Sequence, residues 1–132
     1  IESNQQMLAD AAAANKIKVV MASLTPVSDH HKDRDPAFER TPQRPPASIQ
    51  ALNEWLRTFC SQRGYGYVDY FAATVDPGGQ FTEDLSDDGL HPNAKGYRVM
   101  APLAALAIDK IFVPPPEIVQ KPKKRSFPSF VK

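Results

Sequence analysis

The hydrophobic pattern of the chain predicts helices that alternate with short strands. The first helix is expected to begin at Ser3-Asn4-Gln5-Gln6, which has the form of a capping box, and to run to about Asn15. Its apolar side chains are Met7, Leu8, Ala11, Ala12 and Ala14. Because most of these side chains are small, the pattern predicts a helix that packs flat against a sheet.

Two segments have the composition of strands. Residues 17–22 are mostly apolar and β-branched, which is typical of a central parallel strand buried on both faces. A second short strand is expected at 65–70. Gly64 and Gly66 are too few and wrongly placed for a dinucleotide-binding loop, so no phosphate site is predicted.

A helix is expected between these strands, from Pro45-Pro46 to Arg63, with Gly64 as its C-terminal cap. One face of this helix carries Ile49, Leu52, Trp55, Leu56 and Phe59. At this spacing Trp55 is predicted to be a core residue rather than a platform for substrate. Cys60 is the single cysteine, and we expect a buried hydrophobic residue rather than a reactive thiol.

The last helix is expected to follow a turn at 76–79 and to start after Asn93, a good N-cap residue. Pro102 is expected to bend this helix. Its predicted buried side consists of Tyr97, Met100, Ala104, Ala107, Ile108 and Ile111.

Between the first strand and the second helix, the segment from Leu24 to Pro46 is polar and proline-rich. It shows neither the helical nor the strand period of hydrophobic residues. Loops of this length are usually functional or disordered, and the position after a strand is where open α/β sheets bind ligands. The segment contains Asp29, His30, His31, Asp33 and Asp35. Adjacent histidines seldom converge on one ion, and no third ligand stands at a helical spacing. We therefore predict a solvated loop and no metal site.

The order of elements predicts an α/β domain with parallel strands joined by crossovers. A length of 132 residues, with 42% hydrophobic and 23% charged residues, suits a single soluble domain. Two convincing strands are few for a parallel sheet, so part of the domain is expected to be missing. The start at Ile1, directly before the capping box, agrees with that expectation and leaves the cellular compartment open.

A basic tail is predicted at 113–132, beyond the domain at 1–112. The tail carries five basic residues against one acidic residue, while the rest of the chain is mildly acidic. Its prolines exclude a regular helix, so we expect an extended or disordered segment. The longest apolar run, 99–108, contains Pro102 and is shorter than the roughly 20 residues that cross a bilayer, so no membrane span is predicted.

Candidate chemistry lies at 87–93, where Asp88 precedes His91 by three residues on a predicted turn. A histidine acts as a general base when one ring nitrogen is free and the other is held by an acceptor such as Asp. Asp87 competes with Asp88 for that role, because either one could cap the turn while the other faces the ring. Alternatively, Asp88 only caps the turn and His91 bonds locally.

Asp88-Gly89-Leu90-His91-Pro92-Asn93, followed by an apolar helix, resembles the last conserved block of the SGNH (GDSL-type) hydrolase family. Residues 17–22 with the Leu24-Thr25-Pro26 exit, and the helix around Leu52-Asn53, are similar to the middle of those proteins. The resemblance covers about residues 1–112. It implies a flavodoxin-like three-layer α/β/α fold with a parallel sheet, of which this chain would be the C-terminal part.

By this resemblance, Asp88 is the triad acid and His91 the general base of an enzyme that hydrolyses carboxylic esters or carbohydrate O-acetyl esters. The family's serine lies in a Gly-Asp-Ser block, and its oxyanion donors include a glycine and an asparagine; these blocks are absent from the 132 residues. Ser86 is a poor substitute because it lies on the wrong side of the turn. We therefore expect the chain to be inactive by itself.

The expected partner is the Ser-bearing N-terminal part of the domain, and the expected substrate is a small ester, with no cofactor. Two alternatives remain open at this point. The chain could be a non-catalytic domain that associates with a second copy through its exposed sheet edge. It could also bind polyanions through the tail at 113–132, although nucleic-acid binding is not the favoured interpretation.

Overall fold

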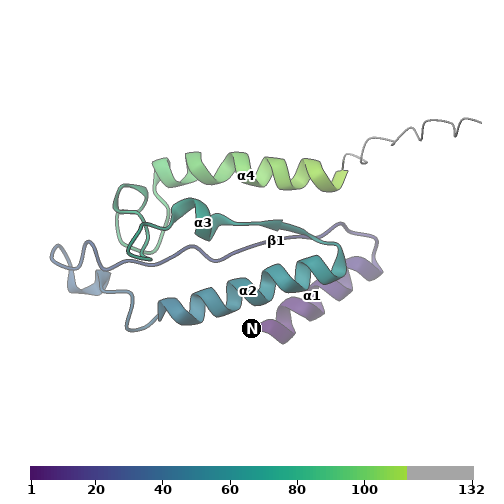
Figure 1. Ribbon diagram of the computed structural model, residues 1–132, viewed down its shortest axis with the longest axis horizontal. Helices are drawn as coiled ribbons and strands as arrows, with labels where there is room; N and C mark the ends of the chain where they lie inside the picture. The colour runs from purple at the N-terminus through teal and green to yellow at the C-terminus, as the bar shows by residue number, and fades with distance from the viewer. Residues whose placement is uncertain (113–132) are drawn as a thin grey trace, which may run out of the picture.

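The computed structural model describes residues 1–112, which form three layers. In chain order the elements are α1 (Glu2–Ala14), β1 (Val20–Ala22), the 3-10 helix η1 (Pro36–Phe38), α2 (Pro46–Arg63), β2 (Gly66–Val68), α3 (Tyr70–Thr74), the 3-10 helix η2 (Glu83–Leu85) and α4 (Ala94–Phe112). Helices α1 and α2 lie on one side of the strands and α4 on the other (Figure 1). This arrangement confirms the predicted α/β class with helices on both faces.

The sheet consists of β1 and β2, which pair in parallel with Met21 opposite Tyr67. Strand β1 is shorter than the predicted strand at 17–22, and Ile17 is 61% exposed. The prediction of burial on both faces was wrong, because Val20 and Met21 are only half-buried. Among the described residues β1 has β2 as its one strand neighbour, so its other edge is open.

Helix α1 departs from its prediction in both its start and its buried face. It begins at Glu2, so Ser3 lies in the first turn and no side chain caps the helix. Met7 and Leu8 are 63% and 60% exposed, while Ala9 is the buried residue. The predicted apolar face is thus largely uncovered, because the described sheet does not extend beside β1 to meet it.

Helix α2 forms the core as predicted, with Gly64 in the left-handed conformation at its C-terminus. Its inner face packs on both strands, and Trp55 stacks on Phe59 with ring centroids 5.1 Å apart. Cys60 is 1% exposed, and this burial raises the pKa of its thiol. The predicted strand at 65–70 ends earlier than expected, at Val68, because α3 begins there with Asp69 as its N-cap.

Helix α4 packs on β2 and continues through Pro102. Its predicted buried side was only partly right, since Ala107 is buried but Tyr97 and Ile108 are 60% and 47% exposed. No helix in the described part of the chain is long and apolar enough to cross a bilayer. The predicted basic tail at 113–132 lies outside the described residues.

Candidate active site

The turn that carries Asp88 and His91 is closed by the Asp88 side chain itself. Oδ1 of Asp88 accepts hydrogen bonds from the amides of Leu90 at 2.9 Å and His91 at 2.8 Å. Gly89 has a φ of +74°, which places it in the left-handed region that favours glycine. Asn93 then starts α4, as predicted, because its Oδ1 accepts from the amides of the first turn. The turn and the helix cap therefore fix where His91 leaves the backbone.

Asp88 and His91 are in direct side-chain contact. Oδ2 of Asp88 lies 2.7 Å from Nδ1 of His91, and the two side chains are 24% and 75% exposed. Because a carboxylate accepts, Nδ1 is assigned as the donor, and Nε2 then carries the free lone pair. The hydrogen bonds among the described residues leave Nε2 free. The ring thus has the orientation and the exposed nitrogen that a general base needs.

Asp87 bonds to Asn93 rather than to the imidazole. Its Oδ1 accepts a hydrogen bond from Nδ2 of Asn93 at 3.0 Å, and that amide also donates to the carbonyl of Asp84. Of the two arrangements that the sequence left open, the structure has Asp88 at the ring and Asp87 at the start of α4. Asp88 nevertheless also closes the turn, so one residue performs both local tasks.

The Asp88 carboxylate is held in its charged form. Its partial burial disfavours the charge, but hydrogen bonds from the amides of His91 and Leu90 and from the His91 ring favour it. These hydrogen bonds, with the attraction of the imidazole, hold the pKa of Asp88 well below its usual range. An ionised Asp88 can therefore orient the ring and stabilise the imidazolium that forms when His91 accepts a proton.

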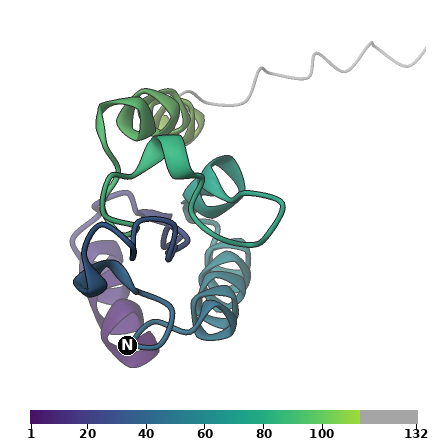
Figure 2. The ribbon, with the colours of Figure 1, turned by 90° about the vertical axis from the view of Figure 1, so that its left-hand side faces the viewer.

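The long loop between β1 and α2 packs against this turn, which the sequence did not predict. The amide of Ser28 donates to the carbonyl of Gly89 at 2.9 Å, and Nε2 of His31 lies 2.8 Å from the carbonyl oxygen of Ser86. Pro26, Val27, Ser28 and His31 are buried. Figure 2 faces this end of the molecule and shows the dark blue loop beside the green segment that leads into α4. The expectation of a solvated loop was wrong for these residues.

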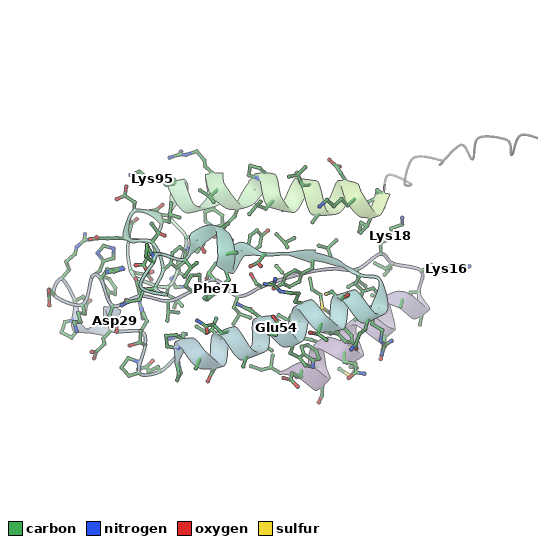
Figure 3. All side chains as sticks on the ribbon, viewed as in Figure 1. Lys16, Lys18, Asp29, Glu54, Phe71 and Lys95 are labelled. Atoms are coloured by element: carbon green, nitrogen blue, oxygen red, sulfur yellow. The ribbon has the colours of Figure 1, made fainter. Side chains whose placement is uncertain are left out.

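The second part of the loop is anchored by Asp29. Its carboxylate accepts from the amides of Arg40 and Thr41 at 2.6 and 3.0 Å, and from the Thr41 hydroxyl at 2.5 Å. Burial acts against the charge of Asp29, but these hydrogen bonds and the attraction of Lys32 lower its pKa below the usual value. Figure 3 shows Asp29 at the same end of the molecule as Lys95 of α4, opposite Lys16 and Lys18.

The candidate metal ligands of the loop have separate partners. His30 contacts Asp76 at 2.9 Å, whereas His31 points to the backbone of Ser86 and Asp29 to the loop backbone. No group of three potential ligands converges anywhere in the described range 1–112. In this structure, these side chains therefore tie the loop to its neighbours.

An apolar cavity of about 550 Å³ reaches the turn of the dyad at Leu90. Its walls include Leu24 and Val27 of the loop, Ile49 and Leu52 of α2, and Leu90, the residue before His91. A cavity of this size falls in the range of small-molecule sites. Sequence reasoning did not find it, because its walls come from segments that are far apart in the chain.

The serines nearest to the dyad are buried. Ser86 is 1% exposed, and its hydroxyl donates to Oδ1 of Asp88 at 3.3 Å, on the carboxylate oxygen that does not contact the ring. Ser28 is also 1% exposed. No hydrogen bond in residues 1–112 joins a serine hydroxyl to the His91 ring. The dyad therefore lacks a nucleophile within the described residues.

Solved structures with the same fold include two from Bacteroides at 28% sequence identity. One is a Bacteroides fragilis protein assigned as an acylhydrolase, with a TM-score of 0.72 over 85% of this chain and 51% of the other. The other is a GDSL-like lipase from Bacteroides thetaiotaomicron, with a TM-score of 0.70 over 83% of this chain and 51% of the other. The chain thus spans about half the length of these proteins. A search of curated proteins found no match.

The sequence comparison covers the turn and most of the elements around it. Residues 2–99 match the GDSL-like Lipase/Acylhydrolase family, and this range includes the loop, both dyad residues and all of the cavity lining except Ile1. The resemblance that the sequence suggested at 88–93 is confirmed by this match and by the shared three-layer fold. The chain belongs to the GDSL-like lipase/acylhydrolase family.

Proposed function

We propose that this chain supplies the general base and the orienting acid, His91 and Asp88, of an acylhydrolase site that cleaves carboxylic esters. The observation that carries the proposal is the 2.7 Å contact between Asp88 and Nδ1 of a ring whose side chain is 75% exposed. In the proposed reaction, Nε2 takes the proton of a serine hydroxyl as that oxygen attacks the ester carbonyl. The protonated ring then gives the proton to the leaving alcohol, and water repeats the cycle on the acyl-serine.

The apolar cavity beside Leu90 supports an ester with a small acyl or alkyl group as substrate. Two of the matched proteins are described as an acylhydrolase and a lipase, which agrees with this substrate class. Carbohydrate O-acetyl esters also fit the proposal, because an acetyl group needs only part of such a cavity. The site needs no cofactor for this chemistry.

The serine is proposed to come from a segment outside the 132 residues, because the nearby serines are buried away from Nε2. The open edge of β1 supports docking of that segment as a further parallel strand. Two apolar side chains of α1, Met7 and Leu8, are exposed and would be covered by such a segment. The matched structures are about twice as long as this chain, which agrees with a second half.

Complementation tests this proposal. The full chain is expected to hydrolyse p-nitrophenyl acetate no faster than buffer. It is expected to gain turnover when co-expressed with the half of the Bacteroides fragilis protein that it does not cover, which we propose as a source of the serine. His91→Ala in the complemented pair should abolish the gain. Steady hydrolysis by the pure chain, or an unchanged rate for His91→Ala in the pair, would contradict the proposal.

Size-exclusion chromatography with light scattering separates this proposal from self-association. A chain that pairs with a second copy through β1 would elute as a dimer and would not bind the Ser-bearing half. The proposal expects the added half to bind in a one-to-one complex. A dimer that persists in the presence of the added half would favour the non-catalytic alternative.

A further inference from the structure

Arg40 reaches the dyad from the long loop, a contact that sequence reasoning missed. Its Nε donates to the carbonyl oxygen of Asp88 at 3.0 Å, and its Nη2 lies 3.3 Å from Oδ2 of the same residue. The Arg40 side chain is 17% exposed, so the guanidinium is largely withdrawn from water. A planar guanidinium bound at two points has little freedom, and it restricts the freedom of the group that it binds.

Arg40 and His91 share one carboxylate oxygen. Oδ2 of Asp88 contacts Nη2 of Arg40 and Nδ1 of His91, while Oδ1 accepts the amides of the turn. The negative charge that would stabilise a protonated His91 is therefore partly used by a permanent cation. Two cations that share one carboxylate oxygen repel each other.

Other charged groups near the turn have partners of their own. Asp87 accepts from Asn93, and Lys95 pairs with Asp84 at 3.0 Å. From the loop side, the Asp29 carboxylate accepts from the backbone amides of Arg40 and Thr41, so it fixes the position of the arginine without touching the dyad. Within residues 1–112, Asp88 pairs with two side chains, those of Arg40 and His91.

We propose that Arg40 is a positioning residue, which fixes the Asp88 carboxylate and whose charge opposes protonation of the His91 ring. The loop between β1 and α2 then has a role in catalysis, because it delivers this arginine to the dyad. The inference rests on the proposed role of the dyad. Its test measures the titration of His91 and needs no turnover, so failure of the inference and failure of the proposed function can be told apart.

The experiment follows the imidazole signals of the full chain by NMR between pH 4 and 9, with the His91 signal assigned from His91→Gln. Arg40→Gln is expected to raise the titration midpoint of His91 by roughly half a unit to one unit, the effect of one cation removed at several ångströms. Arg40→Lys keeps the charge and should restore most of the original midpoint. A midpoint that is unchanged or lowered in Arg40→Gln would overturn the inference.

Arg44→Gln is the matched control, because it removes the same charge from the same loop at a residue that lines the apolar cavity instead. An equal shift in both variants would mean that only net charge matters and would also overturn the inference. If Arg40→Gln does not fold, Thr41→Val decides. This substitution removes the hydroxyl contact to Asp29 without a change of charge and so loosens the loop that holds Arg40. The titration midpoint of His91 should still rise by a few tenths of a unit. An unchanged midpoint would contradict the inference.

Discussion

The backbones of Ser28 and Gly89 are in direct contact, because the Ser28 amide donates a 2.9 Å hydrogen bond to the Gly89 carbonyl. A Cβ atom added to Gly89 would lie 2.2 Å from the Ser28 carbonyl oxygen. Ser28 follows the first strand and Gly89 lies inside the turn of the dyad. This contact therefore joins the long loop to the segment that orients His91, and it tolerates no side chain at position 89.

Gly89→Ala is expected to destabilise the chain strongly. The left-handed conformation costs a non-glycine residue about 1–2 kcal/mol, and the overlap with backbone atoms adds to this cost. We expect a loss of about 3 kcal/mol or more in the free energy of unfolding, measured by urea denaturation followed by circular dichroism.

Gly79→Ala provides the control for this prediction. Gly79 has a similar φ of +81°, but an added Cβ would meet no atom within 4 Å. Its loss should be limited to the conformational cost of about 1–2 kcal/mol. Equal losses for the two variants would mean that the contact with Ser28 does not constrain the turn.

Asp88→Asn is expected to lower the turnover of the complemented enzyme by about 10²- to 10⁴-fold. The amide cannot stabilise a protonated ring, and it can present an N–H group to Nδ1 and so favour the wrong tautomer. Turnover of p-nitrophenyl acetate measures the effect. Asp87→Asn should keep most of the activity, because Asp87 contacts Asn93 rather than the ring. A larger loss for Asp87→Asn than for Asp88→Asn would mean that Asp87, and not Asp88, is the acid that orients the ring.

The local parts of the site could be predicted from the sequence, because they are set by short-range chemistry. An Asp three residues before a His, on a turn with Gly89, brings the two side chains together through the turn's own hydrogen bonds. The cap of α4 by Asn93 and the cap of α2 by Gly64 follow from the same kind of rule.

The long-range parts could not be predicted in this way. Arg40 lies 48 positions before Asp88, and a polar, proline-rich loop carries no period that would reveal the contact. The buried face of α1 was also predicted wrongly. A hydrophobic pattern shows which side chains are apolar, but it does not show whether another part of the described chain packs on them. Met7 and Leu8 remain exposed for that reason.

Stability at acidic pH should reflect the carboxylates that hold the loop and the turn. Burial opposes the charges of Asp29, Asp76 and Asp88, but hydrogen bonds lower the pKa of each. In the unfolded chain the pKa of each of these groups is about 3.9. As the pH falls toward and below that value, the unfolded state therefore binds more protons than the folded state. The contribution of these groups is present above about pH 5 and is lost as the pH falls through their lowered folded-state values.

Urea denaturation at several pH values between 3 and 6 measures this dependence. The free energy of unfolding should decrease from pH 5 to pH 3, and Asp29→Asn should show a smaller decrease because one of the linked groups is removed. The same decrease in the variant and in the unsubstituted chain would mean that Asp29 does not contribute to the pH dependence.

Docking of the Ser-bearing half should depend on the exposed face of α1. Met7 and Leu8 are 63% and 60% exposed on α1, and burial of such side chains contributes about 1.5–3 kcal/mol each. The double substitution Met7→Glu with Leu8→Glu is therefore expected to weaken the complex at least about tenfold, measured by isothermal titration calorimetry. Thr58→Glu, on an exposed position of α2, adds a charge away from this face and should leave the affinity unchanged. Equal affinity for the double variant would place the docking surface elsewhere.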